Sequence, residues 1–296
     1  METNKRIFAL GFFDGVHLGH QALLRRCRAL ADEMGCEAAA ITFDRHPKSL
    51  FLSPAPVLIS AGPDRQRLLC RYGMDRVYTL PVTAESMAMP WEEFLRQLLR
   101  DGAAGFVCGH DFRFGARGAG NTEILQSTCE KLGIPCVVVP EQTLDGVRIS
   151  SSHIRNLIED GKMESATKFL GHPYLLTGTV VRGHQLGRKL GFPTANLVLP
   201  GDLAIPKFGV YACRAVVDGA AYPAVTNIGT RPTVSGEGIT VEPWILDFSG
   251  DLYDREITLE IYRFLRPEMK FSGLEDLRRQ VRQDAADTRV YLEGRL

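Results

Sequence analysis

The sequence predicts two folds in succession: a doubly wound parallel α/β domain, then a small antiparallel β-barrel closed by a C-terminal helix. Strand-like and helix-like segments alternate as far as Ile149, which is the pattern of βαβ units. After Ile149, short β-type runs follow one another without intervening helices, which favours a barrel. A chain of 296 residues is long enough for two domains that each bury a core.

Hydrophobic periodicity sets the elements of the first domain. Apolar residues at helical spacing, beginning with Leu23 and Leu24, predict the first helix, and glycines after helical runs mark the helix ends. The expected strands are 7–11, 38–43, 76–80, 105–108 and 136–139. The expected helices are 19–34, 64–72, 91–100 and 122–132.

In the second part of the chain, helices give way to strands. Ser150–Ser152 supplies N-cap hydroxyls for a helix that Gly161 ends, and a second short helix spans 164–170. We therefore expect domains at 1–170 and 171–296. The expected barrel strands are 175–181, 210–217, 221–227, 240–248 and 257–264, and an amphipathic helix over 273–292 closes the domain.

Composition excludes several classes of protein. Apolar residues make up 45% and charged residues 24%, and there is no run of about 18 apolar residues that would span a membrane. Lys plus Arg and Asp plus Glu number 35 each, so the basic excess of a nucleic-acid binder is missing. Without a signal-peptide pattern, we expect a cytoplasmic protein with reduced, mostly buried cysteines. The oligomeric state does not follow from the sequence.

The turn Gly11–His20 joins the first expected strand to the first helix. Unpaired backbone N–H groups and the helix dipole make such a helix start suitable for phosphate. His17 and His20 can both face it and stabilise charge on a leaving pyrophosphate, while Gly15 and Gly19 allow close approach of the backbone. The same residues also fit a capped turn with two surface histidines, or half of a metal site.

Three further loops lie where a parallel sheet places ligand contacts. They are His46-Pro47, Gly109–Gly115, and the helix start Ser150–Ser152 with Arg155. Gly115–Thr122 matches a P-loop except that Asn121 stands in place of the phosphate-binding Lys, so we do not expect a P-loop.

A second candidate site follows the first barrel strand. Three glycines stand at four-residue spacing: Gly183, Gly187 and Gly191. Their N–H groups can fold over phosphates, with Arg188 as a neutralising charge. Thr194 and Asn196 offer a hydroxyl and an amide oxygen to Mg²⁺.

Glu242 is a carboxylate among apolar neighbours in the strand expected at 240–248, and it is a candidate base for a primary alcohol. Taken one by one, these features also fit a hairpin turn, an ordinary strand entry and a solvent-facing Glu.

In this order, the motifs resemble those of the bacterial bifunctional riboflavin kinase/FAD synthetase family. The segments similar to its adenylyltransferase module, of the nucleotidyltransferase superfamily, are Gly11–His20, His46-Pro47, Asp111–Gly115 and Ile149–Ser152 with Arg155. The segments similar to its riboflavin kinase module are Gly191–Asn196, Asn227–Thr233, Glu242 and Leu265–Phe271. The resemblance implies a nucleotidyltransferase α/β domain followed by a six-stranded Greek-key barrel with a C-terminal helix.

The resemblance also implies two reactions that use ATP and Mg²⁺. Riboflavin would become FMN at the barrel, and FMN would become FAD, with release of pyrophosphate, in the N-terminal domain. Riboflavin, FMN and ATP would be the partners, with no nucleic acid and no membrane.

Residue roles carry over by position. His17 and His20 would be catalytic in the first module, where ATP would also contact Gly11, Phe13, Asp14, Gly19, His46, Asp111, Ser151, Ser152 and Arg155. Glu242 would deprotonate riboflavin in the second module, and Thr194 and Asn196 would bind Mg²⁺. ATP there would contact Gly183, Gly187, Arg188, Gly191, Thr194 and Asn196, and the flavin would lie near Arg266, Lys270 and Phe271.

The sequence departs from the family at three places. Arg45 stands where Pro is usual, Ser152 where Thr is usual, and Pro243-Trp244 follows Glu242 where a small or charged residue and then His are more common. We therefore expect altered packing beside Glu242. Two alternatives are a nucleotidyltransferase for another substrate, such as a pantetheine phosphate or a nicotinate nucleotide, and a flavin sensor without turnover.

Overall fold

The computed structural model describes residues 5–183, 187, 190–233 and 236–294, with side chains throughout except at 231–237. The chain divides into two compact units, Met1–Ser151 and Ser152–Leu296. The helices α6 (Ser151–Glu159) and α7 (Met163–Leu170) thus fall with the second unit. A functional boundary at residue 170 remains a prediction.

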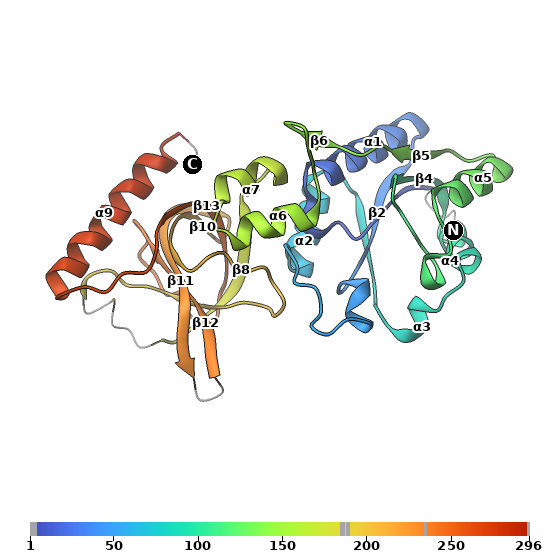
Figure 1. Ribbon diagram of the computed structural model, residues 1–296. Coiled ribbons are helices and arrows are strands. Elements are labelled where there is room, and N and C mark those ends of the chain that lie inside the picture. Colours follow the sequence, from blue (N-terminus) through green and yellow to red (C-terminus); the bar gives the residue numbers. More distant parts are fainter. Residues whose placement is uncertain (1–4, 184–186, 188–189, 234–235, 295–296) are drawn as a thin grey trace. The chain divides into compact units, whose positions relative to one another are not determined.

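The first unit is built on a five-stranded parallel sheet (Figure 1). Its strands are β1 (Arg6–Leu10), β2 (Glu37–Phe43), β3 (Arg76–Leu80), β4 (Ala103–Gly109) and β5 (Cys136–Val139). Their order is β3-β2-β1-β4-β5, so the winding direction reverses between β1 and β4. Sheets of this kind bind ligands in the crevice at the carboxyl ends of the two strands where the winding reverses.

Helices cover both faces of this sheet, as right-handed crossovers require. They are α1 (Leu18–Met34), α2 (Gly62–Arg71), α3 (Ala84–Met87), α4 (Trp91–Arg100) and α5 (Thr122–Leu132), with short 3₁₀ helices η1 (Asp14–Val16), η2 (Pro47–Leu50) and η3 (Ala116–Gly118). Leu95 of α4 and Leu125 of α5 pack in one core with Phe106 of β4. On α1, the buried Cys27 thiol donates to the carbonyl of Ile7 at 3.3 Å. The predicted doubly wound architecture is confirmed.

Local sequence accounts for the helix ends in this unit. Gly35 after α1 and Gly133 after α5 take the left-handed conformation, with φ of 63° and 67°, and so end their helices. The Asn121 side chain caps α5 by accepting the N–H of Ile124 at 2.9 Å. Asn121, the residue that breaks the P-loop match, is therefore a helix cap. A two-stranded hairpin follows β5, with β6 (Thr143–Leu144) and β7 (Val147–Arg148).

The second unit contains a closed barrel (Figure 1). Its strands are β8 (Tyr174–Val181), β9 (Asn196–Val198), β10 (Gly209–Val217), β11 (Ala220–Thr233), β12 (Gly236–Ile245) and β13 (Glu256–Arg266). The order around the barrel is β10-β11-β12-β9-β8-β13. Because β10, β11 and β12 are consecutive neighbours and β13 returns beside β10, this is a Greek key. The six-stranded Greek-key barrel is confirmed.

Helix α9 (Leu274–Leu292) packs against β10 and β11 of the barrel. Of the apolar residues at helical spacing, Ala285 is buried, Leu277 and Val281 are half-buried, and Leu274 at the helix start is exposed. All seven cysteines are free, and four of them, Cys27, Cys108, Cys129 and Cys213, are buried. Among the helices of the described residues, none combines the length and apolar character needed to cross a membrane.

Candidate active sites

The turn between β1 and α1 has a strained backbone. Phe13, Gly15 and Val16 have φ of 58°, 76° and 40°, and a β-branched residue such as Val rarely adopts such values. A Cβ at Gly15 would lie 2.8 Å from Cγ2 of Ile59, so this position requires glycine. Strain of this kind persists only where the surroundings fix it, and it clusters at functional sites.

Hydrogen bonds of Asp14 and Ser60 hold the turn in place. The Asp14 carboxylate, 2% exposed, accepts the N–H groups of Ile59 at 2.9 Å and Ser60 at 3.1 Å. The Ser60 hydroxyl accepts the N–H of Gly15 at 3.0 Å, and the Ser151 hydroxyl donates to the Asp14 carbonyl at 3.1 Å. The Asp14 carboxylate thus supports the turn itself, and its expected contact with ATP remains a prediction.

His17 and His20 lie together at the start of α1. Their rings stack with centroids 3.6 Å apart and planes 13° from parallel. His17 caps the helix, since its Nδ1 accepts the N–H of His20 at 3.3 Å. The Nδ1 of His20 is buried and has no hydrogen-bond partner among the described residues.

The charge state of His20 follows from its surroundings. Burial, together with the neighbouring His17 and Arg65, lowers the pKa of His20 well below its usual range. His20 is therefore neutral at physiological pH and can donate a hydrogen bond from one ring nitrogen.

A cavity of about 220 Å³ opens over this turn. Its lining comes from the turn, the loops after β4 and β5, and β7: His17, Gly19, His20, Leu23, Gly109, His110, Asp111, Val139, Pro140, Glu141, Gln142, Arg148, Ile149, Ser150 and Ser151. The structure thus brings together five of the residues expected to bind ATP, namely His17, Gly19, His20, Asp111 and Ser151.

The cavity also contains Arg148, which the motifs do not single out. Its guanidinium donates to Asp111 at 3.1 Å and to Glu141 at 2.9 Å. An isolated Arg in a hairpin strand carries no sequence signal for a binding site. The one available signal is that Arg148 lies three residues before Ser151, which belongs to a motif facing the turn.

Gly11 and Phe13 of the turn, and His46 after β2, do not line this cavity. The buried Phe13 ring meets the His20 ring edge-on at 5.3 Å. The His46 ring packs edge-on against Phe12 at 5.1 Å. Their expected contacts with ATP remain predictions.

Ser152 and Arg155 belong to helix α6 in the second compact unit. Ser152 is exposed and Arg155 is half-buried. Their contribution to an ATP site in the first unit also remains a prediction.

A second, largely apolar cavity of about 290 Å³ lies in the first unit and reaches Gly11 at the end of β1. Its lining is Phe8, Leu10, Gly11, Ile41, Phe43, Tyr78, Leu80, Pro81, Ser86, Met87, Met89, Phe94, Gln97, Leu98, Asp101, Phe112, Arg113, Phe114 and Gly115. The rings of Phe112 and Phe114 stack with centroids 5.5 Å apart. Apolar and aromatic walls with a few polar groups are typical of sites for planar ligands.

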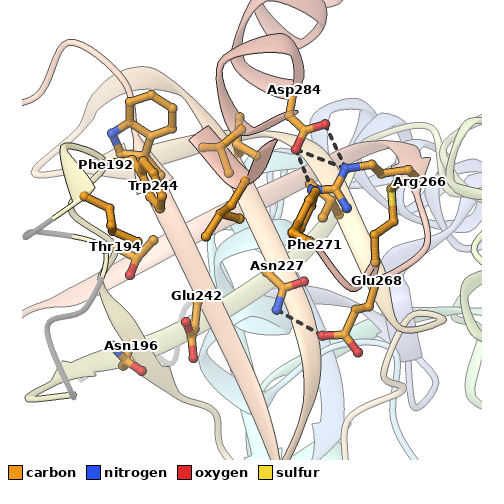
Figure 2. Close-up of a pocket in the computed structure, with 17 residues that line it drawn as sticks. Phe192, Thr194, Asn196, Asn227, Glu242, Trp244, Arg266, Glu268, Phe271 and Asp284 are labelled. Atoms are coloured by element: carbon orange, nitrogen blue, oxygen red, sulfur yellow. Dashed lines mark hydrogen bonds and ion pairs between the residues drawn. The ribbon is translucent and has the colours of Figure 1, made fainter. Parts of the chain in front are cut away.

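In the second unit, a cavity of about 290 Å³ lies between the barrel wall and α9 (Figure 2). It is lined by Gly187, Leu190, Phe192, Thr194, Asn196, Val210, Val225, Asn227, Glu242, Trp244, Arg266, Glu268, Met269, Phe271, Leu277, Val281 and Asp284. The expected base, both expected metal ligands and two of the three expected flavin contacts are in this set.

Strand register brings the polar groups of this cavity together. Glu242 of β12 lies opposite Asn227 of β11. Val241 pairs with Leu197, so Asn196 at the start of β9 lies beside Glu242 on its other side. Figure 2 shows Thr194, Asn196 and Glu242 along one wall.

The oxygens of Thr194 and Asn196 suit Mg²⁺, which prefers hard oxygen ligands and takes the rest of its shell from phosphate and water. Gly183 packs so closely on Asn196 that a Cβ at Gly183 would overlap the Asn196 amide. No group of three His, Cys, Asp or Glu residues in the described parts of the chain could hold a metal. The donor chemistry of Thr194 and Asn196 alone thus fits a magnesium ion that takes its other ligands from phosphate and water.

The opposite wall is held by a buried ion pair. Arg266 donates to Asp284 through Nε at 2.9 and 3.1 Å and through Nη2 at 2.7 Å, and Asp284 is 2% exposed. The guanidinium carbon of Arg266 lies 5.8 Å from the Phe271 ring centroid. The ion pair therefore ties β13 to α9 and fixes the wall where the flavin is expected.

Other side chains complete this cavity. Glu268 accepts a hydrogen bond from Asn227 at 3.2 Å, and the Trp244 ring lies 6.1 Å from that of Phe192. Trp244, at a departure from the family pattern, therefore forms part of the cavity wall. The exposed Lys270 does not belong to the described lining.

The glycine-rich segment before this wall is only partly described. Gly187 lines the cavity, and Gly191 is exposed with a φ of 89°. Arg188 lies outside the described residues. A neighbouring cavity of about 610 Å³ shares Thr194 and is otherwise lined by Val180, Pro193, Ala195, Pro243, Ile245, Phe248, Ser249, Gly250, Asp251, Leu252 and Tyr253.

Comparison with known proteins identifies the family of the chain. The FAD synthetase family model matches residues 1–153, and the riboflavin kinase model matches residues 170–292. A bifunctional riboflavin kinase/FMN adenylyltransferase from Listeria monocytogenes is 34% identical over 97% of this chain and 92% of that protein. One of the same name from Pseudomonas fluorescens is 36% identical over 96% of this chain and 92% of that protein.

A solved structure from Streptococcus pneumoniae, described as a macrolide-efflux protein, is also similar. It covers 98% of this chain and 95% of its own, with 30% identity and a TM-score of 0.87. The two family models follow one another in the order that the sequence motifs indicate. The chain therefore belongs to the bifunctional riboflavin kinase/FMN adenylyltransferase family.

Proposed function

We propose that the barrel cavity phosphorylates riboflavin to FMN and that the turn after β1 is where FMN is adenylylated to FAD. The two activities are those of the family, riboflavin kinase and FMN adenylyltransferase. The observation that carries the assignment is that each compact unit contains its own polar cavity. One has Glu242 beside Asn196, and the other has His17 stacked on His20.

At the barrel, Glu242 accepts the proton of the ribityl 5′-hydroxyl as its oxygen attacks the γ-phosphorus of ATP, and ADP leaves. The isoalloxazine ring packs against Phe271 and Trp244 on the apolar walls. ATP extends past Thr194 into the neighbouring cavity, since Thr194 lines both. Thr194 and Asn196 would hold Mg²⁺, which neutralises phosphate charge when bound.

At the N-terminal turn, a phosphate oxygen of FMN attacks the α-phosphorus of ATP, and pyrophosphate leaves. Negative charge grows on the leaving group, so groups that donate hydrogen bonds to it accelerate the step. The start of α1 supplies a favourable dipole, and His17 and His20 supply ring nitrogens. The flavin ring of FMN occupies the apolar cavity with Phe112 and Phe114, which reaches Gly11 at the end of β1.

The test is a time course. The purified chain is incubated with riboflavin, ATP and Mg²⁺, and flavins are separated by chromatography. We expect FMN to rise first and FAD to follow. FMN alone would contradict the role given to the N-terminal turn, and flavin binding without any product would indicate a sensor.

A further inference from the structure

Arg65 in helix α2 is fully buried, at 0% exposure. By volume, it is the largest of the fully buried side chains in the described structure. Its Nη2 donates to the backbone carbonyl of Phe43 at the end of β2. Its Nε and Nη1 are buried and have no hydrogen-bond partner among the described residues. A buried guanidinium with two unpaired nitrogens is costly, and an apolar side chain of the same volume would pack there at lower cost. Stability therefore does not explain why this position has an Arg.

The contacts of Arg65 lead to the phosphate turn. Its guanidinium carbon lies 4.5 Å from the ring centroid of Phe12, which precedes the strained Phe13. The same Phe12 ring packs against His46. Arg65 thus joins the end of β2 to the segment that leaves β1, and both segments carry residues of the proposed site.

The charge of Arg65 also acts at this turn. Burial lowers the pKa of Arg65, while Asp14 and Asp44 oppose that shift and favour the charged form. Arg65 is in turn one of the charges that lower the pKa of His20. Two groups with buried, unpaired nitrogens, His20 and Arg65, therefore lie within electrostatic reach of each other at one end of the sheet.

We propose that Arg65 is a positioning residue of the adenylyltransferase site: it holds the turn that carries His17 and His20, and its buried positive charge strengthens the attraction of that turn for the ATP phosphates. The inference rests on the proposed location of FAD formation at this turn. It adds a residue from a helix that no sequence motif connects with the site.

The kinetic test uses Arg65→Gln, Arg65→Met and Arg65→Lys in the full chain. Loss of the charge should lower kcat/KM for FAD formation from FMN about tenfold or more, with a raised KM for ATP, as for a lost electrostatic contact to a transition state. Arg65→Lys keeps the charge and should recover most of this loss. Arg67→Gln, on the same helix but with a half-exposed side chain, is the matched control and should remain near wild type. Riboflavin phosphorylation should be unchanged in all four variants.

A second readout follows the charge on His20. Removing a positive neighbour makes protonation easier, so Arg65→Gln should raise the pKa of His20, and the neutral ring should be lost at a higher pH as the solution is acidified. His17 shares the turn with His20, and His110, Asp111, Glu141 and Arg148 line the same cavity; all of these are unchanged in the variant. Side-chain ¹⁵N NMR of His20 measures the shift directly, and the acid limb of kcat/KM should move in the same direction.

The outcomes separate the two proposals. Arg65→Gln with wild-type kinetics and an unshifted His20 titration would overturn the role of Arg65. If the uncharged variants do not fold, Arg65→Lys decides: the proposal requires a wild-type His20 titration there, and a shifted one contradicts it. If the wild-type chain makes no FAD, the proposed function fails, whereas the coupling of Arg65 to His20 is still measured by NMR.

Discussion

The two sites differ in what holds their functional groups in place. At the N-terminal turn the backbone does so, with positive φ at three nearby residues and with His17 capping its own helix. In the barrel the strand register does so, since Glu242 lies between Asn227 and Asn196 on neighbouring strands. The first site should therefore be sensitive to substitutions that disturb the backbone conformation, and the second to the loss of single side chains.

The polar groups of the two sites also differ. Arg266 in the barrel is satisfied by Asp284 before any ligand arrives. At the N-terminal site, His20 of the turn and Arg65 of α2 contain buried nitrogens that lack hydrogen-bond partners among the described residues. The barrel wall is thus preformed. At the turn, His20 lines the cavity, so a bound anion can offset the cost of its unpaired ring nitrogen.

The largest effect should come from Glu242→Gln, which removes the base and keeps the shape of the side chain. FMN formation from riboflavin should fall about 10²–10⁴-fold, the usual contribution of a general base, while FAD formation from FMN stays intact. Chromatography of the two reactions measures this. The exposed Glu256→Gln, on β13 of the same barrel, is the control. Equal loss of both activities would mean that the sites are not separate.

His20→Ala should give the reverse pattern. Loss of a hydrogen-bond donor to the leaving pyrophosphate should lower kcat for FAD formation about 10²–10³-fold, with FMN accumulating from riboflavin. Arg25→Ala, exposed on the same helix, should be neutral. FAD output that stays at the wild-type rate would remove His20 from the mechanism.

Gly15→Ala sharpens the claim that backbone geometry holds the turn. The new Cβ meets Ile59 at 2.8 Å in a left-handed conformation, so the turn must shift, and a displacement of about 1 Å can cost about 10²-fold in rate. Gly35→Ala is the matched control. Its φ is also positive, at 63°, but the added Cβ would meet no atom within 4 Å. Both should lose about 1–2 kcal/mol of stability from the left-handed residue. Only Gly15→Ala should slow FAD formation, and equal kinetics in the two variants would contradict the comparison.

Asn196→Ala should have the smallest effect of these changes. Loss of one oxygen ligand should raise the KM for Mg·ATP in riboflavin phosphorylation about tenfold, with FAD formation unaffected. Kinetics at varied Mg²⁺ measure it, with Val198→Ala, exposed on the same short strand, as control. An effect limited to adenylylation would contradict the assignment.

Several elements with clear apolar patterns could be predicted to the residue. The helix at 91–100 and the strands at 76–80 and 136–139 have the same bounds in the structure as in the sequence pattern. The strand β9 and the helix α3 were missed because these short segments, NLV and AESM, contain neither a continuous apolar run like that of β5 nor an apolar period. The position of β9 matters for function, since it places Asn196 beside Glu242.

Residues that line the cavity over the turn could be predicted where a motif sits at a strand end, as for His17, His20 and Asp111. Arg65 could not, because in sequence it is one of three arginines in an amphipathic helix, and only the fold shows that it is the buried one. The apolar cavity with Phe112 and Phe114 was missed for a similar reason. Its walls come from several strands and helices that are distant in the chain.

The central claim is that two independent sites act in sequence, and mixing two inactive variants tests it most directly. Glu242→Gln lacks the first step and His20→Ala lacks the second, so neither should convert riboflavin to FAD alone. Mixed in one tube with riboflavin, ATP and Mg²⁺, they should form FAD after a lag, as FMN released by one variant is adenylylated by the other. A mixture that never forms FAD, although each variant keeps its remaining single activity, would contradict the account.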